Sequence, residues 1–417
     1  MVLLHFQSAF GICVIIALAW ALSENRRAFP WRTVILGLAL QVAIALLLLK
    51  VPLARDALFA LNSAVDALTS ATRTGTSFVF GFVGGGAPPF TVTNPSGMVS
   101  FAFGILPLVI VISALSALLW HWRILPVIVK AIALGLRKLL GIGGAVGLGS
   151  AATVFLGMVE APLLIRPYLA RLTRAELFML MTVGLASVAG TVFVLYATIL
   201  KSVVPGALGH ILIASMMSLP AAIVIARIMI PGEAGAGTQA SSDVRYRSSM
   251  DAIARGTEDG LKIYLQILAM LIVIVALVAL GDTILKQLPA VDGAPLTLER
   301  LFGWLFAPLV WLYGVPWQEA VTAGSLMGVK TILNELVAYL DLAALPKGAL
   351  DPRATLIMVY AMCGFANLGS VGIMIAGMST LMPDRRDEIV PLAMRAIVSG
   401  TMASGLTGAM IGLLPVI

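Results

Sequence analysis

The fold of this chain is decided by Phe155-Leu156-Gly157-Met158-Val159-Glu160-Ala161-Pro162 and by a second stretch, Thr331-Ile332-Leu333-Asn334-Glu335-Leu336-Val337-Ala338-Tyr339. Each stretch places a glutamate inside a long apolar segment that small and polar residues interrupt. A carboxylate at the centre of a bilayer costs about 3 kcal/mol on insertion scales, so such residues usually mark a pathway or a binding site. We therefore expect Glu160 and Glu335 at a functional site. The alternative for each is a structural ion pair, with Arg166 or Lys330 respectively.

The composition identifies lipid as the solvent for much of the surface. Of the 417 residues, 60% are hydrophobic and 11% are charged, and the mean hydropathy is +1.03. In a soluble domain, about a quarter of the residues are charged. The net charge of +7 comes from basic residues in short gaps between apolar runs. This pattern is typical of cytoplasmic loops, so we expect a multi-pass protein of the cell inner membrane with no nucleic-acid partner.

The apolar runs predict an all-α polytopic membrane protein with about eight transmembrane helices. A span needs roughly 20 apolar residues. The runs that qualify are 4–22, 33–52, 100–120, 176–200, 206–230, 262–286, 354–382 and 388–416. Residues 54–80 and 123–140 fit helices that lie along the membrane surface. Residues 141–172 and 302–345 are apolar but broken, and they contain the two glutamates.

The basic residues indicate the orientation. They gather after the first and third spans, before the fourth, between the fifth and sixth, and before the eighth. Alternating spans put all five gaps on one side. That side is predicted to be the cytoplasm, so both termini should lie outside it. Lys50, Arg55 and Arg73 run against the pattern, which makes it a bias and not a strict partition.

A further pattern relates the two broken segments. Gly184-Leu185-Ala186-Ser187-Val188-Ala189-Gly190 follows the first, and Gly364-Phe365-Ala366-Asn367-Leu368-Gly369-Ser370 follows the second. Each run has a polar residue among small ones, where a helix can unwind and leave backbone groups free to bind a ligand. The two copies enter from opposite sides, so we interpret them as an inverted repeat with a site near the midplane. Ordinary helix packing is the alternative for the small residues alone.

The residues favour binding over catalysis. The sequence contains no nucleophile with a base, no metal-ligand cluster and no phosphate-binding Gly-Lys-Ser/Thr loop. We therefore expect neither an enzyme nor a cofactor, and an ion gradient as the energy source. Glu335, Asn367 and Ser370 can bond to hydroxyls, and the ring of Phe365 can stack on a base. This set suits a neutral solute with a polyol end and a flat end.

These residues resemble the motifs of the concentrative nucleoside transporter family. The matching runs are Gly157-x-x-Glu160-x-Pro162, Lys330-x-x-x-Asn334-Glu335-x-Val337-Ala338-Tyr339 and Tyr360-Ala361-x-Cys363-Gly364-Phe365-Ala366-Asn367-x-Gly369-Ser370. The resemblance extends from about residue 5 to the end of the chain. It implies an ion-coupled symporter that imports nucleosides and assembles as a homotrimer. A transport domain with two opposed re-entrant hairpins would move like an elevator past a scaffold domain.

The resemblance also implies a division of the chain and roles for residues. Residues 1–122 would be mainly scaffold, 123–230 the first repeat, 231–300 a polar loop with a scaffold span, and 301–417 the second repeat. Both repeats would belong to the transport domain. The expected substrate contacts are Glu335, Asn367 and Ser370 to the ribose, Phe365 against the nucleoside, and Met158, Val159 and Glu160 facing the base.

Two departures from the family pattern concern selectivity and the ion. Met158 and Val159 stand where the family has Gln and Thr or Ser, and they offer no side-chain hydrogen bonds to a base. We expect altered base selectivity or a ligand other than uridine. Thr153 stands where sodium-coupled members have Asn, which favours a proton as the coupling ion. Sodium is the alternative, and its expected ligands are Thr153, Leu156, Ser187, Val188 and Thr191.

Three other functions stay open from the sequence. A transporter of the same architecture for another nucleobase-containing or polyol solute is motivated by Met158 and Val159. An ion channel would need a continuous polar pore, and a membrane enzyme would need a reactive constellation. Saturable uptake against a gradient would separate a transporter from a channel.

Overall fold

A computed structural model describes residues 2–92, 100–158, 160–232, 246–291 and 293–414. These residues fold into helices, with one isolated β-bridge between Val291 and Ala294. The helices of the first half are α1 (Val2–Ala21), α2 (Trp31–Lys50), α3 (Pro52–Phe80), α4 (Leu108–His121), α5 (Ile124–Leu140), α6 (Gly144–Ala152), α7 (Glu160–Leu163), α8 (Arg166–Leu169), α9 (Arg174–Ala186) and α10 (Gly190–Leu200). Those of the second half are α11 (Ala207–Met229), α12 (Ser249–Leu285), α13 (Leu298–Tyr313), α14 (Trp317–Ile332), α15 (Glu335–Ala344), α16 (Pro352–Met362), α17 (Leu368–Leu381) and α18 (Arg386–Leu413).

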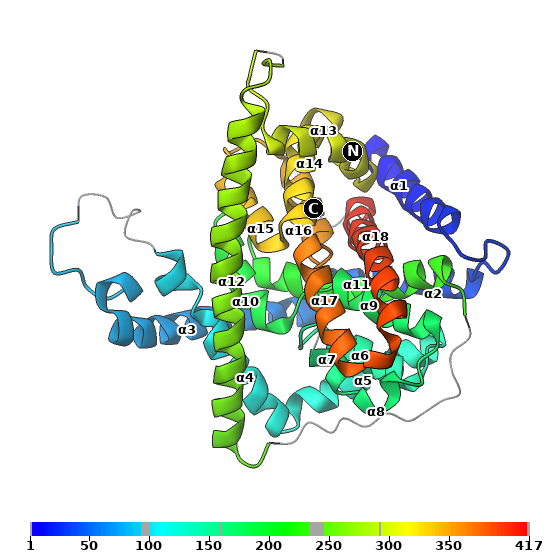
Figure 1. Cartoon of the computed structure of the whole chain (residues 1–417), viewed down its shortest axis with the longest axis horizontal. Helices are drawn as coiled ribbons and strands as arrows, with labels where there is room; N and C mark the ends of the chain where they lie inside the picture. The colour runs from blue at the N-terminus through cyan, green and yellow to red at the C-terminus, as the bar shows by residue number, and fades with distance from the viewer. Residues whose placement is uncertain (1, 93–99, 159, 233–245, 292, 415–417) are drawn as a thin grey trace.

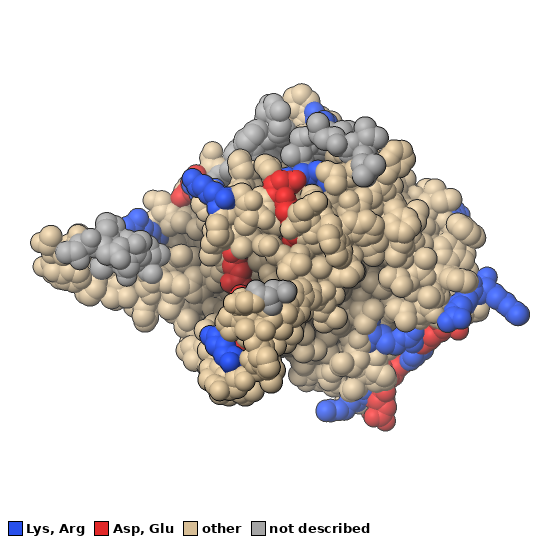
Figure 2. Space-filling view, turned by 90° about the horizontal axis from the view of Figure 1, so that it is seen from above, with Lys and Arg blue, Asp and Glu red and all other residues tan. Residues whose placement is uncertain are grey.

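The predicted all-α membrane architecture is confirmed. Seven helical segments of the described chain are long and apolar enough to cross a membrane: Leu4–Ala21, Trp31–Lys50, Phe101–His121, Arg174–Leu200, Ala207–Met229, Ser249–Leu285 and Pro383–Leu413. The third of these joins α4 to a short π-helix, η3 (Phe101–Ile105). Figure 2 shows the corresponding surface, on which uncharged residues cover most of the visible face.

The seventh predicted span, 354–382, is not one continuous helix. Helix α16 ends at Met362, and α17 starts at Leu368 after Asn367 caps its first turn. The apolar run was long enough on hydropathy alone, but a Gly and an N-capping Asn within five residues stop the helix. Each half is therefore too short to span a bilayer alone.

Helix α12 begins earlier than the predicted span 262–286. It starts at Ser249, where the Ser248 side chain accepts a hydrogen bond from the Asp251 backbone N–H. Arg255 then donates to the Asp251 carboxylate one turn below, at 3.0 Å. N-capping and charge pairs of this kind extend a helix through a polar sequence that hydropathy assigns to a loop.

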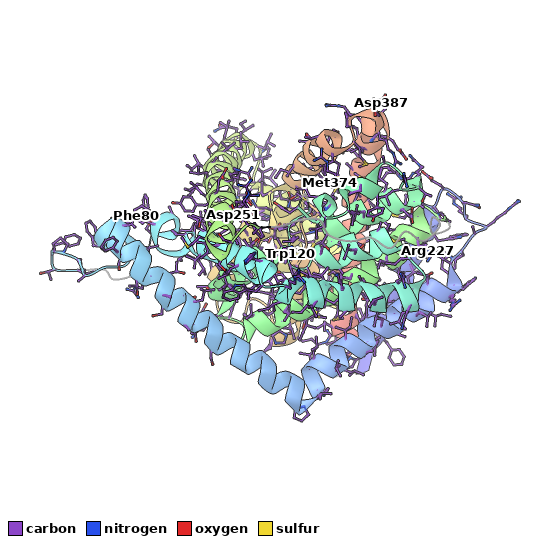
Figure 3. The ribbon with its side chains drawn as sticks, turned by 90° about the horizontal axis from the view of Figure 1, so that it is seen from below. Phe80, Trp120, Arg227, Asp251, Met374 and Asp387 are labelled. Atoms are coloured by element: carbon purple, nitrogen blue, oxygen red, sulfur yellow. The ribbon has the colours of Figure 1, made fainter. Side chains whose placement is uncertain are left out.

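The two broken segments form short helices, as their glycines and prolines suggest. Residues 141–172 contain α6, α7 and α8, and residues 302–345 contain most of α13 with α14 and α15. The two mixed stretches are helices α3 and α5. Figure 3 shows α3 meeting α2 at an angle and running outward along one edge to Phe80.

The packing separates one helix pair from the rest. Helix α4 packs along α12, while α11 and α18 pack against each other and against α9 and α16. Helix α1 packs on α18, and α2 packs on α11. Figure 1 shows α12 as a long helix at one side of this body. Its outer residues are exposed, as Ile272 (71%) and Ile284 (63%) illustrate, so this face is built for lipid or another apolar surface.

Candidate functional site

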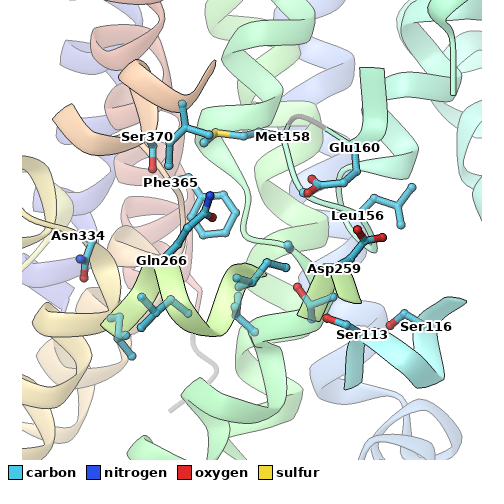
Figure 4. A pocket seen from close by; sticks show the side chains of 18 of the residues that line it. Ser113, Ser116, Leu156, Met158, Glu160, Asp259, Gln266, Asn334, Phe365 and Ser370 are labelled. Atoms are coloured by element: carbon cyan, nitrogen blue, oxygen red, sulfur yellow. The ribbon is translucent and has the colours of Figure 1, made fainter. Parts of the chain in front are cut away.

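A cavity of about 410 Å³ lies between the α4–α12 pair and the first turns of α7, α10, α15 and α17. Its lining includes Met158, Glu160, Glu335, Asn367 and Ser370, which come from distant parts of the sequence. Figure 4 shows Glu160, Phe365 and Ser370 among the side chains around it. A volume of this size suits a small organic solute.

Two interruptions of helices cross beside this cavity. Ser187, Val188 and Ala189 separate α9 from α10, and residues 363–367 separate α16 from α17. The Phe365 backbone N–H donates to the Ser187 carbonyl at 3.2 Å, so the two interruptions are bonded to each other. A Cβ on Gly364 would lie 2.8 Å from the Ala186 carbonyl oxygen. Only glycine allows the two backbones to approach this closely.

Glu335 is the most firmly held of the predicted substrate residues. Its side chain is 4% exposed, and its Oε1 accepts a hydrogen bond from the Tyr196 hydroxyl at 2.6 Å. The other oxygen, Oε2, accepts from Asn367 Nδ2 at 3.2 Å. Asn367 in turn accepts from the Ser370 backbone N–H at 2.8 Å. Three predicted residues therefore form one hydrogen-bonded unit at the starts of α15 and α17, where helix dipoles favour a carboxylate.

Lys330 stabilises the backbone beside this hydrogen-bonded unit. The residue is fully buried, and its ammonium group donates to the Ala366 carbonyl at 3.2 Å. Ala366 lies in the interruption between Phe365 and Asn367, where helical partners for the carbonyl are lost. Lys330 thus holds the backbone that presents both neighbouring side chains.

The first predicted base-facing segment lines the opposite part of the cavity. Met158 and Glu160 are in the lining, and Val159 lies outside the described residues. Met158 packs against α9, because a Cβ on Gly184 would lie 3.1 Å from its Cβ. Glu160 folds back over Gly157, where an added Cβ would lie 2.1 Å from its Oε2.

The five predicted ion ligands fall into two groups. Leu156 and Thr191 line the cavity. The other three have other hydrogen bonds: Thr153 Oγ1 donates to the Ser150 carbonyl at 2.7 Å, Ser187 Oγ donates to the Val183 carbonyl at 2.9 Å, and the Val188 carbonyl accepts from Ser215 Oγ at 3.4 Å. Their oxygens retain lone pairs for a hard cation, since each bond uses only one acceptor site or one hydrogen.

Several lining residues were missed in the sequence. Tyr196 belongs to a continuous apolar run, and nothing in its neighbourhood points to Glu335, which is 139 positions away. Ser113, Ser116, Asp259 and Gln266 line the cavity from α4 and α12. A signal for the last four did exist, because their spacing places each pair on one helical face.

Comparison with known proteins decides what kind of molecule this is. Models of the N-terminus and C-terminus of Na⁺-dependent nucleoside transporters match residues 10–83 and 210–412, and a nucleoside-recognition model matches residues 102–203. Nucleoside permease NupC of Helicobacter pylori is 34% identical over 97% of both chains. The chain belongs to the concentrative nucleoside transporter family. The uncharacterized transporter YutK of Bacillus subtilis is 37% identical over 97% of this chain and 98% of its own.

Solved structures of this family share the fold described above. CNTnw in an inward-facing, substrate-bound state has a TM-score of 0.89 and 36% identity, covering 99% of both chains. A variant of CNTnw in an outward-facing state has a TM-score of 0.91 and 34% identity, covering 99% of this chain and 98% of its own. Family members are transporters and not enzymes.

Proposed function

We propose that this concentrative nucleoside transporter relative is a symporter that imports nucleosides with an ion. The observation that supports the proposal most directly is the buried Glu335 carboxylate, held by Tyr196 and Asn367 at one end of a 410 Å³ cavity. A carboxylate and an amide fixed in this way can bond to the two hydroxyls of a ribose. The Phe365 ring in the same cavity lining gives a flat surface for the nucleoside.

Each predicted site residue has a place in this proposal. Glu335, Asn367 and Ser370 bind the ribose, and Phe365 lies against the nucleoside. Glu160 faces the base, together with Met158 and Val159. A nucleoside bound here would be enclosed by interrupted helices on one side and by α4 and α12 on the other.

In our proposal, the transport domain that moves past the scaffold includes most of the chain. The sequence division put residues 1–122 mainly in the scaffold, but α1 packs on α18 and α2 on α11. We therefore assign α1 and α2 to the moving body and keep α3, α4 and α12 as the scaffold. The site would then cross the membrane past the α4–α12 pair, in a homotrimer with both termini outside the cytoplasm. One cysteine introduced on α4 and one at the start of α15 would test this assignment by cross-linking. If the proposed body moves past α4, adding substrate separates the two cysteines and the cross-link is lost.

Sodium is the proposed coupling ion. The matching family models are described as Na⁺ dependent, and the hydroxyls of Thr153 and Ser187 with the Val188 carbonyl would be oxygen ligands for this ion. The proton is the second candidate, because Thr153 lacks the amide of sodium-coupled members. Replacing sodium by choline at fixed pH decides between them. Uptake that collapses supports sodium, and uptake that persists and follows a pH gradient supports the proton.

A different solute is the second candidate function. Met158 lines the cavity and cannot hydrogen-bond a base edge as an amide would. Competition of labelled uridine uptake by a panel of nucleosides tests this point. A profile led by uridine would show that Met158 leaves selectivity unchanged.

A further inference from the structure

The α4–α12 pair is held together by an unusually close contact. A Cβ on Gly256 would lie 2.7 Å from the Ser113 carbonyl oxygen, and a Cβ on Gly260 would lie 2.7 Å from the Ile110 Cα. Two glycines one turn apart let helices in a membrane approach backbone to backbone. This contact fixes the rotation of both helices and so decides which of their residues face the cavity.

The face turned to the cavity carries four polar side chains among apolar ones such as Trp120 and Ile263. Ser113 and Ser116 on α4 and Asp259 and Gln266 on α12 all line it. Ser113 is 6% exposed, and its hydroxyl has no hydrogen-bond partner among the described residues. Asp259 has an ion pair with Lys262 on its own helix, at 3.8 Å, which is beyond hydrogen-bond distance. This wall therefore carries hydrogen-bonding groups with capacity to spare.

The wall that carries Met158 offers a base edge one carboxylate, that of Glu160, and no side-chain amide. Met158 offers only a thioether there. A nucleoside whose base gives up hydrogen bonds to water and forms no new ones in the cavity binds more weakly for each bond that is not replaced. The groups that line the cavity across from Met158 are those of the α4–α12 wall.

We propose that Asp259, with Gln266 two turns further along the same face of α12, reads the base and selects nucleosides that carry an exocyclic amino group. This inference rests on the proposed transport of nucleosides. A carboxylate is an acceptor only, so it pairs with the amino group of cytidine or adenosine. It repels the carbonyl oxygen that uridine presents at the same place. Helix α12 belongs to the proposed scaffold, past which the substrate site moves. The contact between Asp259 and the base therefore forms in only one state of the transport cycle. It affects which base is selected more than it affects binding of the ribose.

The test uses two neighbouring carboxylates. Asp259→Asn removes the cavity-lining charge. Glu258→Gln is the matched control, because Glu258 also pairs with Lys262, at 2.9 Å, and has an almost equal exposed fraction (66% against 67%) but does not line the cavity. The quantity measured is the ratio of cytidine to uridine uptake at low substrate in proteoliposomes. Protein amount cancels within each variant.

We expect the ratio to fall by about fivefold in Asp259→Asn, in line with the loss of one charged hydrogen bond in a partly hydrated site, and to stay within twofold in Glu258→Gln. A ratio within twofold of the wild type in Asp259→Asn would overturn the inference. An equal fall in both variants would also overturn it, since the effect would then belong to the charge of the helix. Wild-type protein that takes up no nucleoside would overturn the proposed function itself, and this inference with it.

Discussion

Tyr196→Phe is the sharpest test of how the site is built. The change removes the hydroxyl group, which donates to Glu335 Oε1 at 2.6 Å in a buried position beside the cavity. The ring stays, and with it the contact to Tyr339 at 5.1 Å between centroids. A hydrogen bond to a charged group contributes about 1.5–3 kcal/mol. We take the lower half of this range, because water from the cavity can reach the freed carboxylate oxygen.

The expected result is an increase of about thirteenfold to fortyfold in the KM for the transported nucleoside. The assay is initial uptake of labelled nucleoside into proteoliposomes over a range of concentrations. Tyr313→Phe is the control, because Tyr313 is fully buried, does not line the cavity, and its hydroxyl has no partner among the described residues. A KM within twofold of the wild type in Tyr196→Phe would refute the claim that this hydroxyl orients Glu335 for binding.

Three further changes probe other parts of the account. Gly364→Ala puts a Cβ 2.8 Å from the Ala186 carbonyl oxygen. The melting temperature in detergent should therefore fall, by an amount that corresponds to about 1–3 kcal/mol of overpacking. An unchanged melting temperature would argue against the close crossing of the two backbones. Arg174 donates to Glu24 at 3.0 Å and holds the pKa of that carboxyl below its usual range. The stabilisation is present at neutral pH and is lost as the pH falls through the lowered pKa. Glu24→Gln should therefore reduce stability by at most about 1 kcal/mol at pH 7 and by progressively less as the pH falls through the lowered pKa. Met158→Gln restores an amide to the cavity lining and should raise the share of uridine in a competition panel, and an unchanged profile would separate Met158 from base selection.

Hydropathy predicted most of the fold because lipid exposure acts on whole segments. Seven spans could be located from runs of about 20 apolar residues. It failed at 354–382, where the capping Asn367 and the preceding glycine end a helix that hydropathy treats as continuous. It also failed at the start of α12, where charge pairs one turn apart extend a helix outside the apolar run.

The site was predictable only where chemistry stands out against an apolar background. Glu160 and Glu335 are exceptional because they lie inside apolar segments. Asn367 lies at a helix interruption that the neighbouring small residues indicate. Asp259 does not stand out in this way, because it belongs to a polar stretch in which a carboxylate is ordinary, and only its helical spacing to Gln266 pointed to a shared face. Its place in the cavity depends on the Gly256 contact between α4 and α12, which is a property of packing and not of local sequence.

Transport of nucleosides with an ion through the Glu335 site can be measured in purified protein. Uptake of labelled uridine and adenosine into proteoliposomes, under an inward sodium gradient or an inward proton gradient, tests it most directly. We predict concentrative uptake driven by sodium and abolished in Glu335→Gln, whose amide cannot accept from both Tyr196 and Asn367 as the carboxylate does. Folded wild-type protein that concentrates neither nucleoside under either gradient would contradict the account.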